Sequence, residues 1–221
     1  LTDWRGLFNG SAQAIVFPRS TEQVSALMAY AQTHNIRIVP QGGNTGLVGG
    51  AIPDNTGSAV ILSLSRMKAI RDFSEANMSM TVEAGCILQE LQAYAEERDL
   101  YFPLNLAAKG SCTIGGNLAT NAGGVNVVRY GNTRDLCLGL EIVLLGGRVM
   151  NLLTPLRKDN TGYDLKNLFI GSEGTLAYST AIELKLWPLP SQKLMGICHF
   201  PTFYKAMDAA QHLVSLDPVA V

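Results

Sequence analysis

Apolar runs and one helical repeat alternate along the first third of the chain. Residues 14–18 (AIVFP) form a short apolar run that is typical of a strand. Ser20 and Gln23 follow with the spacing of a capping box, and the apolar residues after them recur at helical spacing. The runs at 36–40 (IRIVP) and 59–64 (AVILSL) predict two more strands, and the second is continuous enough to be buried on both faces. This order predicts a small α/β unit.

After residue 80 the apolar pattern changes. A helix is predicted at 87–95, where apolar residues line one side. Residues 139–153 hold two apolar runs joined by Gly146 and Gly147, which is the pattern of a hairpin with a two-residue glycine turn. IELKLW at 182–187 alternates apolar and polar residues with the period of a strand. The predicted fold class is therefore α+β: a small α/β part and a mostly antiparallel sheet with flanking helices.

The segment PLP, Pro188 to Pro190, is the best candidate for a linker. Residues 193–200 predict a strand and residues 202–215 a helix, and the last seven residues, SLDPVAV, resemble the beginning of another strand. A new structural unit is thus expected after the linker. The expected division of the chain is a domain at 1–190 with subdomains 1–75 and 76–190, followed by the start of a truncated C-terminal domain at 191–221.

Composition and charge exclude several classes of protein. The chain has 221 residues, 47% of them hydrophobic and 16% charged, which is enough for a substantial core. The formal net charge is −1 and no run of Lys and Arg occurs, so a nucleic-acid partner is not expected. No apolar stretch approaches the roughly 18 residues that a transmembrane helix needs, and the N-terminus lacks the pattern of a signal peptide.

The cysteines and histidines do not form a recognisable site. The four cysteines have no CxxC spacing and the three histidines do not group with them, so no metal site is predicted. Reduced, mostly buried thiols are expected, and with them a reducing, cytoplasmic location. His34, His199 and His212 are expected to be structural or exposed rather than catalytic.

The loop PQGGNTGLVGG, from Pro40 to Gly50, contains five glycines and joins two predicted strands. Such a cluster is kept where the chain needs unusual backbone angles or where something approaches the main chain closely. A second loop, KGSCTIGGNLATNAGG at 109–124, is also rich in glycine and small polar residues. Neither loop matches a known phosphate motif. Asn44 breaks the dinucleotide GxGxxG pattern, and Gly116 and Asn117 occupy the positions where a P-loop has Lys and Ser or Thr.

Two interpretations of these loops remain. They are wide surface turns, for which glycine and asparagine are the ordinary residues. Alternatively, they are main-chain nests that hold a phosphate or pyrophosphate by converging N–H groups, because no basic side chain lies in the first loop and only Lys109 borders the second.

Four motifs occur in a fixed order along the chain: PQGGNTGLVGGAIP, GSCTIGGNLATNAGG, RYGNTRDLCLGLEIVL and FIGSEGTLAYSTAIELKL. In order and spacing they resemble the FAD-binding domain of the vanillyl-alcohol oxidase/p-cresol methylhydroxylase (PCMH) superfamily. Within it, the chain looks most like the D-2-hydroxyacid dehydrogenase branch, especially D-2-hydroxyglutarate dehydrogenase-like and D-lactate dehydrogenase-like bacterial proteins. The resemblance covers the chain from about Asp3 to Pro190 and implies a two-subdomain, PCMH-type fold.

The resemblance also implies where FAD would lie. The first loop supplies amides to the pyrophosphate, the second lies along pyrophosphate and flavin, and the GSEGTL segment with Ile182 closes over the adenosine and ribityl side. Glu173 either accepts from a cofactor hydroxyl or braces the neighbouring loop, and Arg129 and Tyr130 either face the flavin or pack as core and rim. The residues expected to bind the cofactor are Pro40, Gln41, Gly42, Gly43, Asn44, Thr45, Gly46, Gly49, Gly50, Ser111, Thr113, Gly115, Gly116, Asn117, Thr120, Gly124, Glu173, Gly174 and Ile182.

Two departures from the superfamily pattern are informative. Members with covalent flavin often carry a histidine in the first loop, where this chain has Asn44. An amide cannot alkylate the flavin methyl group, so FAD is expected to be non-covalent. Ala177 and Tyr178 replace residues that are usually smaller, and they are expected to crowd the adenine side.

The chemistry implied by the resemblance is oxidation of a D-2-hydroxy acid of the D-2-hydroxyglutarate, D-lactate or glycolate type. A base takes the hydroxyl proton while hydride passes from C2 to flavin N5. In such proteins the base, the substrate clamp and any divalent metal come largely from a following cap domain, so the catalytic residues of this chain are unassigned. The alternative is a flavin- or nucleotide-binding scaffold without chemistry of its own. The electron acceptor is unassigned, and the oligomeric state is open, with a homodimer among the alternatives.

Overall fold

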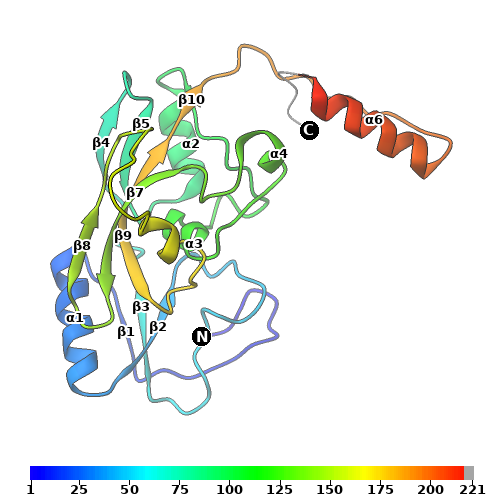
Figure 1. The fold of residues 1–221 in the computed structure, drawn as a ribbon. Helices are drawn as coiled ribbons and strands as arrows, with labels where there is room; N and C mark the ends of the chain where they lie inside the picture. The colour runs from blue at the N-terminus through cyan, green and yellow to red at the C-terminus, as the bar shows by residue number, and fades with distance from the viewer. Residues whose placement is uncertain (217–221) are drawn as a thin grey trace.

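Two β-sheets form the body of the molecule (Figure 1). The structure is a computed structural model and describes residues 1–216. The smaller sheet is parallel with the order β1-β3-β2, in which β1 is Ala14–Val16, β3 is Ala59–Ser63 and β2 is Arg37–Gln41. Helix α1 (Thr21–Thr33) connects β1 to β2. The predicted order of strand, helix, strand and strand is confirmed, and every residue of β3 is buried, as its continuous apolar run predicted.

The larger sheet is antiparallel throughout and has the order β4-β5-β9-β7-β8. Its strands are β4 (Ile70–Ser74), β5 (Ser79–Glu83), β7 (Cys137–Leu144), β8 (Val149–Leu152) and β9 (Ala177–Lys185). The predicted α+β class, with a largely antiparallel later part, is confirmed. Because β4 pairs with β5, β4 belongs to the larger sheet and the smaller sheet ends with β3. The predicted first subdomain, 1–75, includes β4.

Helix α2 (Leu88–Glu96) is the helix predicted at 87–95. Its apolar side, with Leu88, Leu91 and Ala95, packs into the core under the larger sheet. The remaining short elements of the body are α3 (Ile114–Ala119), α4 (Val127–Tyr130) and α5 (Lys166–Phe169), together with the paired strands β6 (Leu100–Tyr101) and β10 (Trp187–Pro188).

The capping box at the start of α1 is only half formed. Ser20 Oγ accepts a hydrogen bond from Gln23 N at 3.4 Å, as its position predicts. Gln23 Oε1, however, accepts from Arg19 N at 2.8 Å rather than from Ser20 N. The side chain of Gln23 therefore holds the backbone of Arg19, which precedes the capping residue.

The hairpin between β7 and β8 is present, but its turn is longer than the predicted pair of glycines. Leu145–Arg148 make the connection, and Leu144 N donates to Arg148 O at 2.9 Å. Gly147 has a φ of +83°, and a Cβ there would lie 2.5 Å from Ser25 O of α1. This glycine therefore provides a left-handed conformation and also a close approach to the helix.

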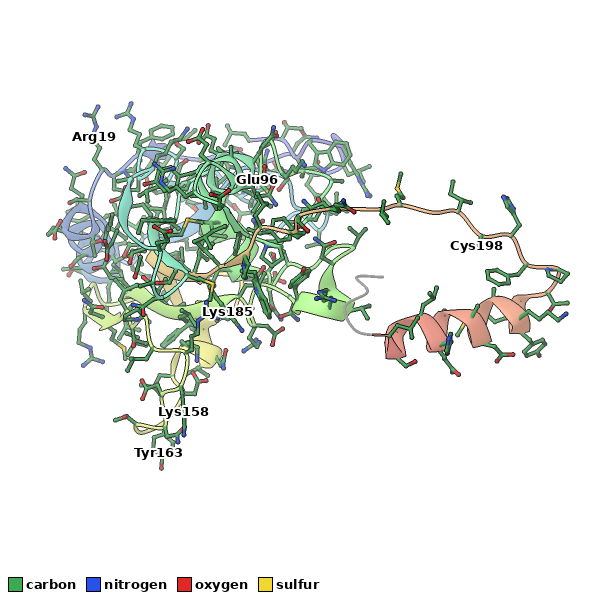
Figure 2. The ribbon with its side chains drawn as sticks, turned by 90° about the horizontal axis from the view of Figure 1, so that it is seen from above. Arg19, Glu96, Lys158, Tyr163, Lys185 and Cys198 are labelled. Atoms are coloured by element: carbon green, nitrogen blue, oxygen red, sulfur yellow. The ribbon has the colours of Figure 1, made fainter. Side chains whose placement is uncertain are left out.

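The strand predicted at 193–200 is not formed. Leu194 and Met195 are 95% and 96% exposed, and no strand of the described chain lies beside them. Alternating apolar residues do not make a strand without a partner to complete the hydrogen bonds. Cys198 lies on this extended segment, away from the body (Figure 2).

Helix α6 (Phe203–Ser215) confirms the helix predicted at 202–215, and Thr202 caps it by accepting from Lys205 N. None of its residues is buried, and Figure 1 shows it held apart from the two sheets. The strand expected to begin in the last seven residues falls mostly on 217–221, outside the described residues. Within residues 1–216, no helix is long and apolar enough to cross a membrane.

The two sheets are joined through α1, which lies across β7 of the larger sheet. Val24 and Met28 of the helix pack with Leu62 of β3, Val143 of β7 and Tyr178 of β9 in one buried cluster. Because these side chains come from both sheets, burying them fixes one sheet against the other.

A polar cluster reinforces this junction at the first turn of α1. Glu141 Oε1 of β7 accepts from Thr21 Oγ1 at 2.6 Å, from Thr180 Oγ1 at 2.8 Å and from Arg71 Nη1 at 3.0 Å. Arg71 also pairs with Glu83 at 3.2 Å. Burial alone would raise the pKa of Glu141, but the hydrogen bonds from Thr21, Thr180 and Arg71 outweigh it and leave the pKa lowered. The ionised carboxylate therefore stabilises the junction.

Replacing Glu141 by Gln is expected to lower the free energy of unfolding by about 1–3 kcal/mol at neutral pH, since three donors lose a charged acceptor. The lowered pKa means that this stabilisation is present above the unfolded-state pKa and is lost as pH falls through the folded-state value. Urea unfolding at pH 7 and in acid checks both points, and the gap between wild type and variant should close in acid. Glu96→Gln, at an exposed site labelled in Figure 2, is the control. Equal stability of Glu141→Gln and wild type at pH 7 would contradict the role of this cluster.

Candidate functional site

A cavity of about 590 Å³ lies where the two sheets meet. Three segments far apart in the sequence line it: the first glycine loop at 40–51, the second glycine-rich segment at 106–122, and the segment at 169–179 that leads into β9. The first comes from the smaller sheet and the other two accompany the larger sheet. The cavity therefore depends on the junction made by α1.

The main-chain N–H groups of the first loop are available to a ligand. Among residues 1–216, none of the N–H groups from Gly43 to Ala51 donates a hydrogen bond within the protein. The base of the loop is braced where Gln41 Nε2 donates to Ala51 O at 3.0 Å and Ile52 N to Gly49 O at 2.9 Å. A run of free N–H groups that borders a cavity has the donors that a main-chain anion site needs.

The second segment uses most of its N–H groups internally. Ile114 N and Gly115 N, at the start of α3, donate to Cys86 O and Ala84 O at 2.9 Å each, and Gly116 N donates to the cap Thr113 Oγ1 at 3.4 Å. Both loops were expected to offer N–H groups to a ligand. The first loop has such free groups, whereas the N–H groups at the start of α3 are already bonded within the protein. This segment provides shape and small side chains, because its donors are already satisfied.

The third segment is tied to the second by backbone bonds. Gly171 N donates to Leu118 O at 3.1 Å and Glu173 N to Ala119 O at 2.8 Å. Arg134 reinforces this position, since its guanidinium donates to Asn167 O and Ile170 O at 2.6 Å each. Glu173 has a left-handed φ of 53°. Within residues 1–216, no other residue that lines the cavity carries a formal charge. Its carboxylate lies beside the first loop, 3.8 Å from where a Cβ of Gly50 would stand.

The glycines of the site fall into two groups. At Gly42, Gly43 and Gly115 a side chain would strike the protein itself: Thr113 Oγ1 at 2.5 Å, the carbonyl oxygen of Ser111, and Ala84 Cβ at 2.7 Å. These glycines are needed where the two loops and β5 pack backbone to backbone. In contrast, a Cβ at Gly46 would meet nothing within 4 Å, and at Gly50 the nearest atom would be 3.8 Å away. Gly116 is intermediate, since a Cβ there would lie tightly, 3.3 Å from Thr113 Oγ1. Packing of the protein does not explain Gly46 and Gly50, whereas a ligand lying on the main chain would.

Most residues predicted to bind the cofactor line the cavity, and four do not. Gly49 lies against the ring of Phe8, and Gly124 against the carbonyl of Asn105. Ser111 presents its carbonyl to Gly43, and Ile182 is fully buried within β9 between Val82 and Leu140. The residues that do line it are Pro40, Gln41, Gly42, Gly43, Asn44, Thr45, Gly46, Gly50, Thr113, Gly115, Gly116, Asn117, Thr120, Glu173 and Gly174.

The apolar walls of the cavity were missed by sequence reasoning. Leu62 and Leu64 at the end of β3, Ala84 after β5, Leu106 and Phe169 all line it. Their only signal in the sequence is hydrophobicity, which equally fits the core. Tyr178, which was expected to crowd the site, lines the cavity and is 6% exposed.

Arg129 and Tyr130 do not line this cavity. The ring of Tyr130 packs edge to face with Tyr101 and Trp187, with centroids 6.0 Å and 5.2 Å apart. Of the two alternatives for Tyr130, the structure supports packing.

The cavity lining holds few groups that can exchange protons. Burial raises the pKa of the Cys112 thiol, so this side chain is neutral at physiological pH. Burial likewise raises the pKa of Tyr178. Asn117 Nδ2 is buried beside them without a hydrogen-bond partner among the described residues, which leaves a polar atom for a ligand to satisfy. Within residues 1–216, no group of three or more His, Cys, Asp or Glu residues could hold a metal ion.

Free N–H groups beside an apolar cavity suit a ligand that carries an anionic group and apolar surface. A family profile described as an FAD binding domain matches residues 12–153, and the chain belongs to this FAD-binding family, of PCMH type. FAD, the expected cofactor, is thereby confirmed. Its pyrophosphate suits the free N–H groups of the first loop, and its ring systems suit the apolar walls.

The curated relatives are considerably longer than this chain. A probable mitochondrial D-2-hydroxyglutarate dehydrogenase from Oryza sativa subsp. indica is 51% identical over 182 residues, which cover 82% of this chain and 32% of the relative. The mitochondrial D-2-hydroxyglutarate dehydrogenase of Bos taurus is 47% identical over 205 residues, covering 93% and 37%. The D-2-hydroxyglutarate–pyruvate transhydrogenase of Saccharomyces cerevisiae is 38% identical and covers 96% and 43%. The chain thus spans about a third of the length of the first two relatives.

Solved structures confirm the fold. Alkyldihydroxyacetonephosphate synthase superposes with a TM-score of 0.77 at 26% identity, covering 91% of this chain and 36% of that protein. A BBE-like protein from Arabidopsis thaliana superposes with a TM-score of 0.69 at 19% identity, over 80% and 35%. The second similarity concerns the fold alone.

The predicted cytoplasmic location is contradicted by these relatives. The dehydrogenases from rice, cattle, zebrafish and Arabidopsis all carry the word mitochondrial in their names. The prediction failed because it rested on cysteines without a pairing or metal-binding pattern. Such cysteines are common to the proteins of any reducing compartment.

Gly43→Ala is expected to lower the free energy of unfolding by about 1–3 kcal/mol, because the new Cβ overlaps the carbonyl of Ser111 and forces the two loops apart. Gly46→Ala, in the same loop but facing open space, should change stability by less than about 0.5 kcal/mol. Chemical denaturation of the two variants without FAD measures the difference. If both variants match wild type, the loops are not in backbone contact as described.

Proposed function

We propose that this chain is the FAD-holding part of a dehydrogenase that oxidises a D-2-hydroxy acid, with D-2-hydroxyglutarate as the first candidate substrate. The observation that carries the proposal is the cavity between the two sheets, with its run of free N–H groups and its apolar walls. The substrate comes from the names of the relatives, which are D-2-hydroxyglutarate dehydrogenases over the part that this chain shares with them.

The chain's own residues would hold and orient the cofactor. The N–H groups between Gly43 and Ala51 would donate to the pyrophosphate, and Gly46 and Gly50 leave the space that it needs. Leu62, Leu64 and the other apolar walls would exclude water from the rings. When bound, FAD supplies the oxidising chemistry as a hydride acceptor. The carboxylate of Glu173 would accept a hydrogen bond from a cofactor hydroxyl, since it is the charged group of the cavity lining and lies beside Gly50.

The catalytic base and the clamp for the substrate carboxylate are proposed to lie outside residues 1–190. His34 stacks on Tyr30 with ring centroids 3.9 Å apart, while His199 and His212 lie on the segment that leaves the body. Among residues 1–216, no histidine lines the cavity. The exposed apolar side chains of residues 194–216 suit the opening of a further domain, whose partner surfaces this chain does not supply.

The proposal is tested by anaerobic titration of the full-length, FAD-loaded protein with D-2-hydroxyglutarate. Loss of the oxidised-flavin absorbance is expected, with L-2-hydroxyglutarate as the matched control that should leave it unchanged. The 221-residue chain alone should bind FAD without being reduced, because positioning and general-base catalysis are missing. An unbleached full-length protein, tested with D-lactate and glycolate as well, would reject the dehydrogenase and favour a flavin-binding scaffold.

FAD is proposed to be bound without a covalent link. Asn44 stands where related flavoproteins carry the linking histidine, and its side chain is directed to Thr2, with Nδ2 donating to Thr2 O at 2.9 Å. Acid precipitation of the FAD-loaded chain should therefore leave all flavin in the supernatant, measured by absorbance. Flavin that stays in the washed pellet would contradict the proposal. Riboflavin mixed with the unloaded chain controls for trapping.

A further inference from the structure

The first ten residues form a closed turn, here called the N-terminal clip (residues 1–10). Asp3 is its centre: its carboxylate accepts from Phe8 N at 2.7 Å and from Arg5 N at 3.2 Å, and its side chain is almost fully buried. Thr2 and Asn9 pair across the turn, and Gly10 N donates to Leu1 O at 3.0 Å. These bonds give the clip a defined shape of its own.

The clip contacts the first glycine loop at two places. Asn44 Nδ2 donates to Thr2 O at 2.9 Å, and the ring of Phe8 lies on Gly49, where a Cβ would stand 2.8 Å from it. Asn44 and Gly49 are near the two ends of the run of free N–H groups. The end of the clip is fixed as well, since Ser11 N donates to Asp54 O at 3.0 Å just beyond the loop.

The loop itself has few bonds that order it. None of the N–H groups from Gly43 to Ala51 makes a hydrogen bond among the described residues, and the only backbone bonds in this stretch are those accepted by the carbonyls of Gly49 and Ala51. Asn44 also has a left-handed φ of 54°, which costs a non-glycine residue free energy unless something compensates. A loop that is disordered before binding must lose that freedom on binding, and this weakens affinity.

We propose that the N-terminal clip is a working part of the FAD site, with Asn44 as a positioning residue. The bond to Thr2 holds Asn44 in its left-handed conformation, Phe8 holds Gly49, and together they order the N–H groups before the cofactor arrives. No residue of the clip is among those that line the cavity, so the effect is transmitted through the loop. The family profile begins only at residue 12, so the clip lies outside the recognised domain. The proposal rests on FAD binding by the first loop, as inferred above.

Two variants test it from opposite sides of the contact. Asn44→Gly allows the left-handed conformation and removes the side chain that donates to Thr2, and it also gives the backbone more freedom. Phe8→Ala removes the contact to Gly49 without changing the loop sequence. Each is expected to raise the Kd for FAD by about five- to tenfold, because each removes one contact that orders the loop. Each should also speed hydrogen–deuterium exchange of peptides within 42–51 in the cofactor-free chain, while peptides from β3 stay as protected as in wild type.

Asn35→Gly is the matched control, because Asn35 is also a left-handed asparagine but has no contact with the clip. It should change neither the Kd nor the exchange of the loop. Wild type that fails to bind FAD would reject the assignment of the cofactor site itself. Wild type that binds FAD, with variants that bind equally well and exchange at the wild-type rate, would overturn the role of the clip alone. If only Asn44→Gly weakens binding, the effect belongs to the loop backbone and the clip is again rejected.

Discussion

The site depends on a contact between two stretches of bare backbone. Gly43 of the first loop lies directly on the carbonyl of Ser111, and Gly42 lies on Thr113 at the start of α3. One loop follows the smaller sheet and the other accompanies the larger sheet, so this contact sets how closely the sheets approach on the cavity side. α1 sets the approach on the other side, through Val24, Met28 and the carboxylate of Glu141. The cavity is the space left between these two junctions.

The contact also explains why the two glycine-rich segments, so similar in composition, do different work. At the start of α3 the N–H groups turn inward to the carbonyls of Cys86 and Ala84, which fastens the helix to the end of β5. In the first loop the corresponding groups have no acceptor in the described protein. The second segment uses its N–H groups in hydrogen bonds within the fold, whereas the N–H groups of the first loop remain available to a ligand.

Much of this arrangement could be predicted from the sequence. The continuous run in β3, the alternation in β9 and the glycine cluster after β2 are local patterns, and each one has the structure that its pattern indicates. The missing parts are non-local. The strand expected at 193–200 needed a partner that the described chain does not supply, and the turn between β7 and β8 was set by the fit of Gly147 against α1. Nothing in the composition of the loops could say that Gly43 faces protein while Gly46 faces open space, because that depends on which other segment lies beside each.

The kind of group that the first loop offers to an anion has a consequence for how the proposed pyrophosphate site would retain its ligand. The first loop offers N–H dipoles and no Lys, Arg or His, and the one charge on the cavity wall, Glu173, is negative. Dipoles fixed in the backbone neither gain nor lose protons across the physiological range. Short-range contacts in a partly enclosed cavity are also screened by dissolved ions much less than contacts between surface charges. An anion held by such groups alone would stay bound through changes of ionic strength and acidity that would release one held by lysines.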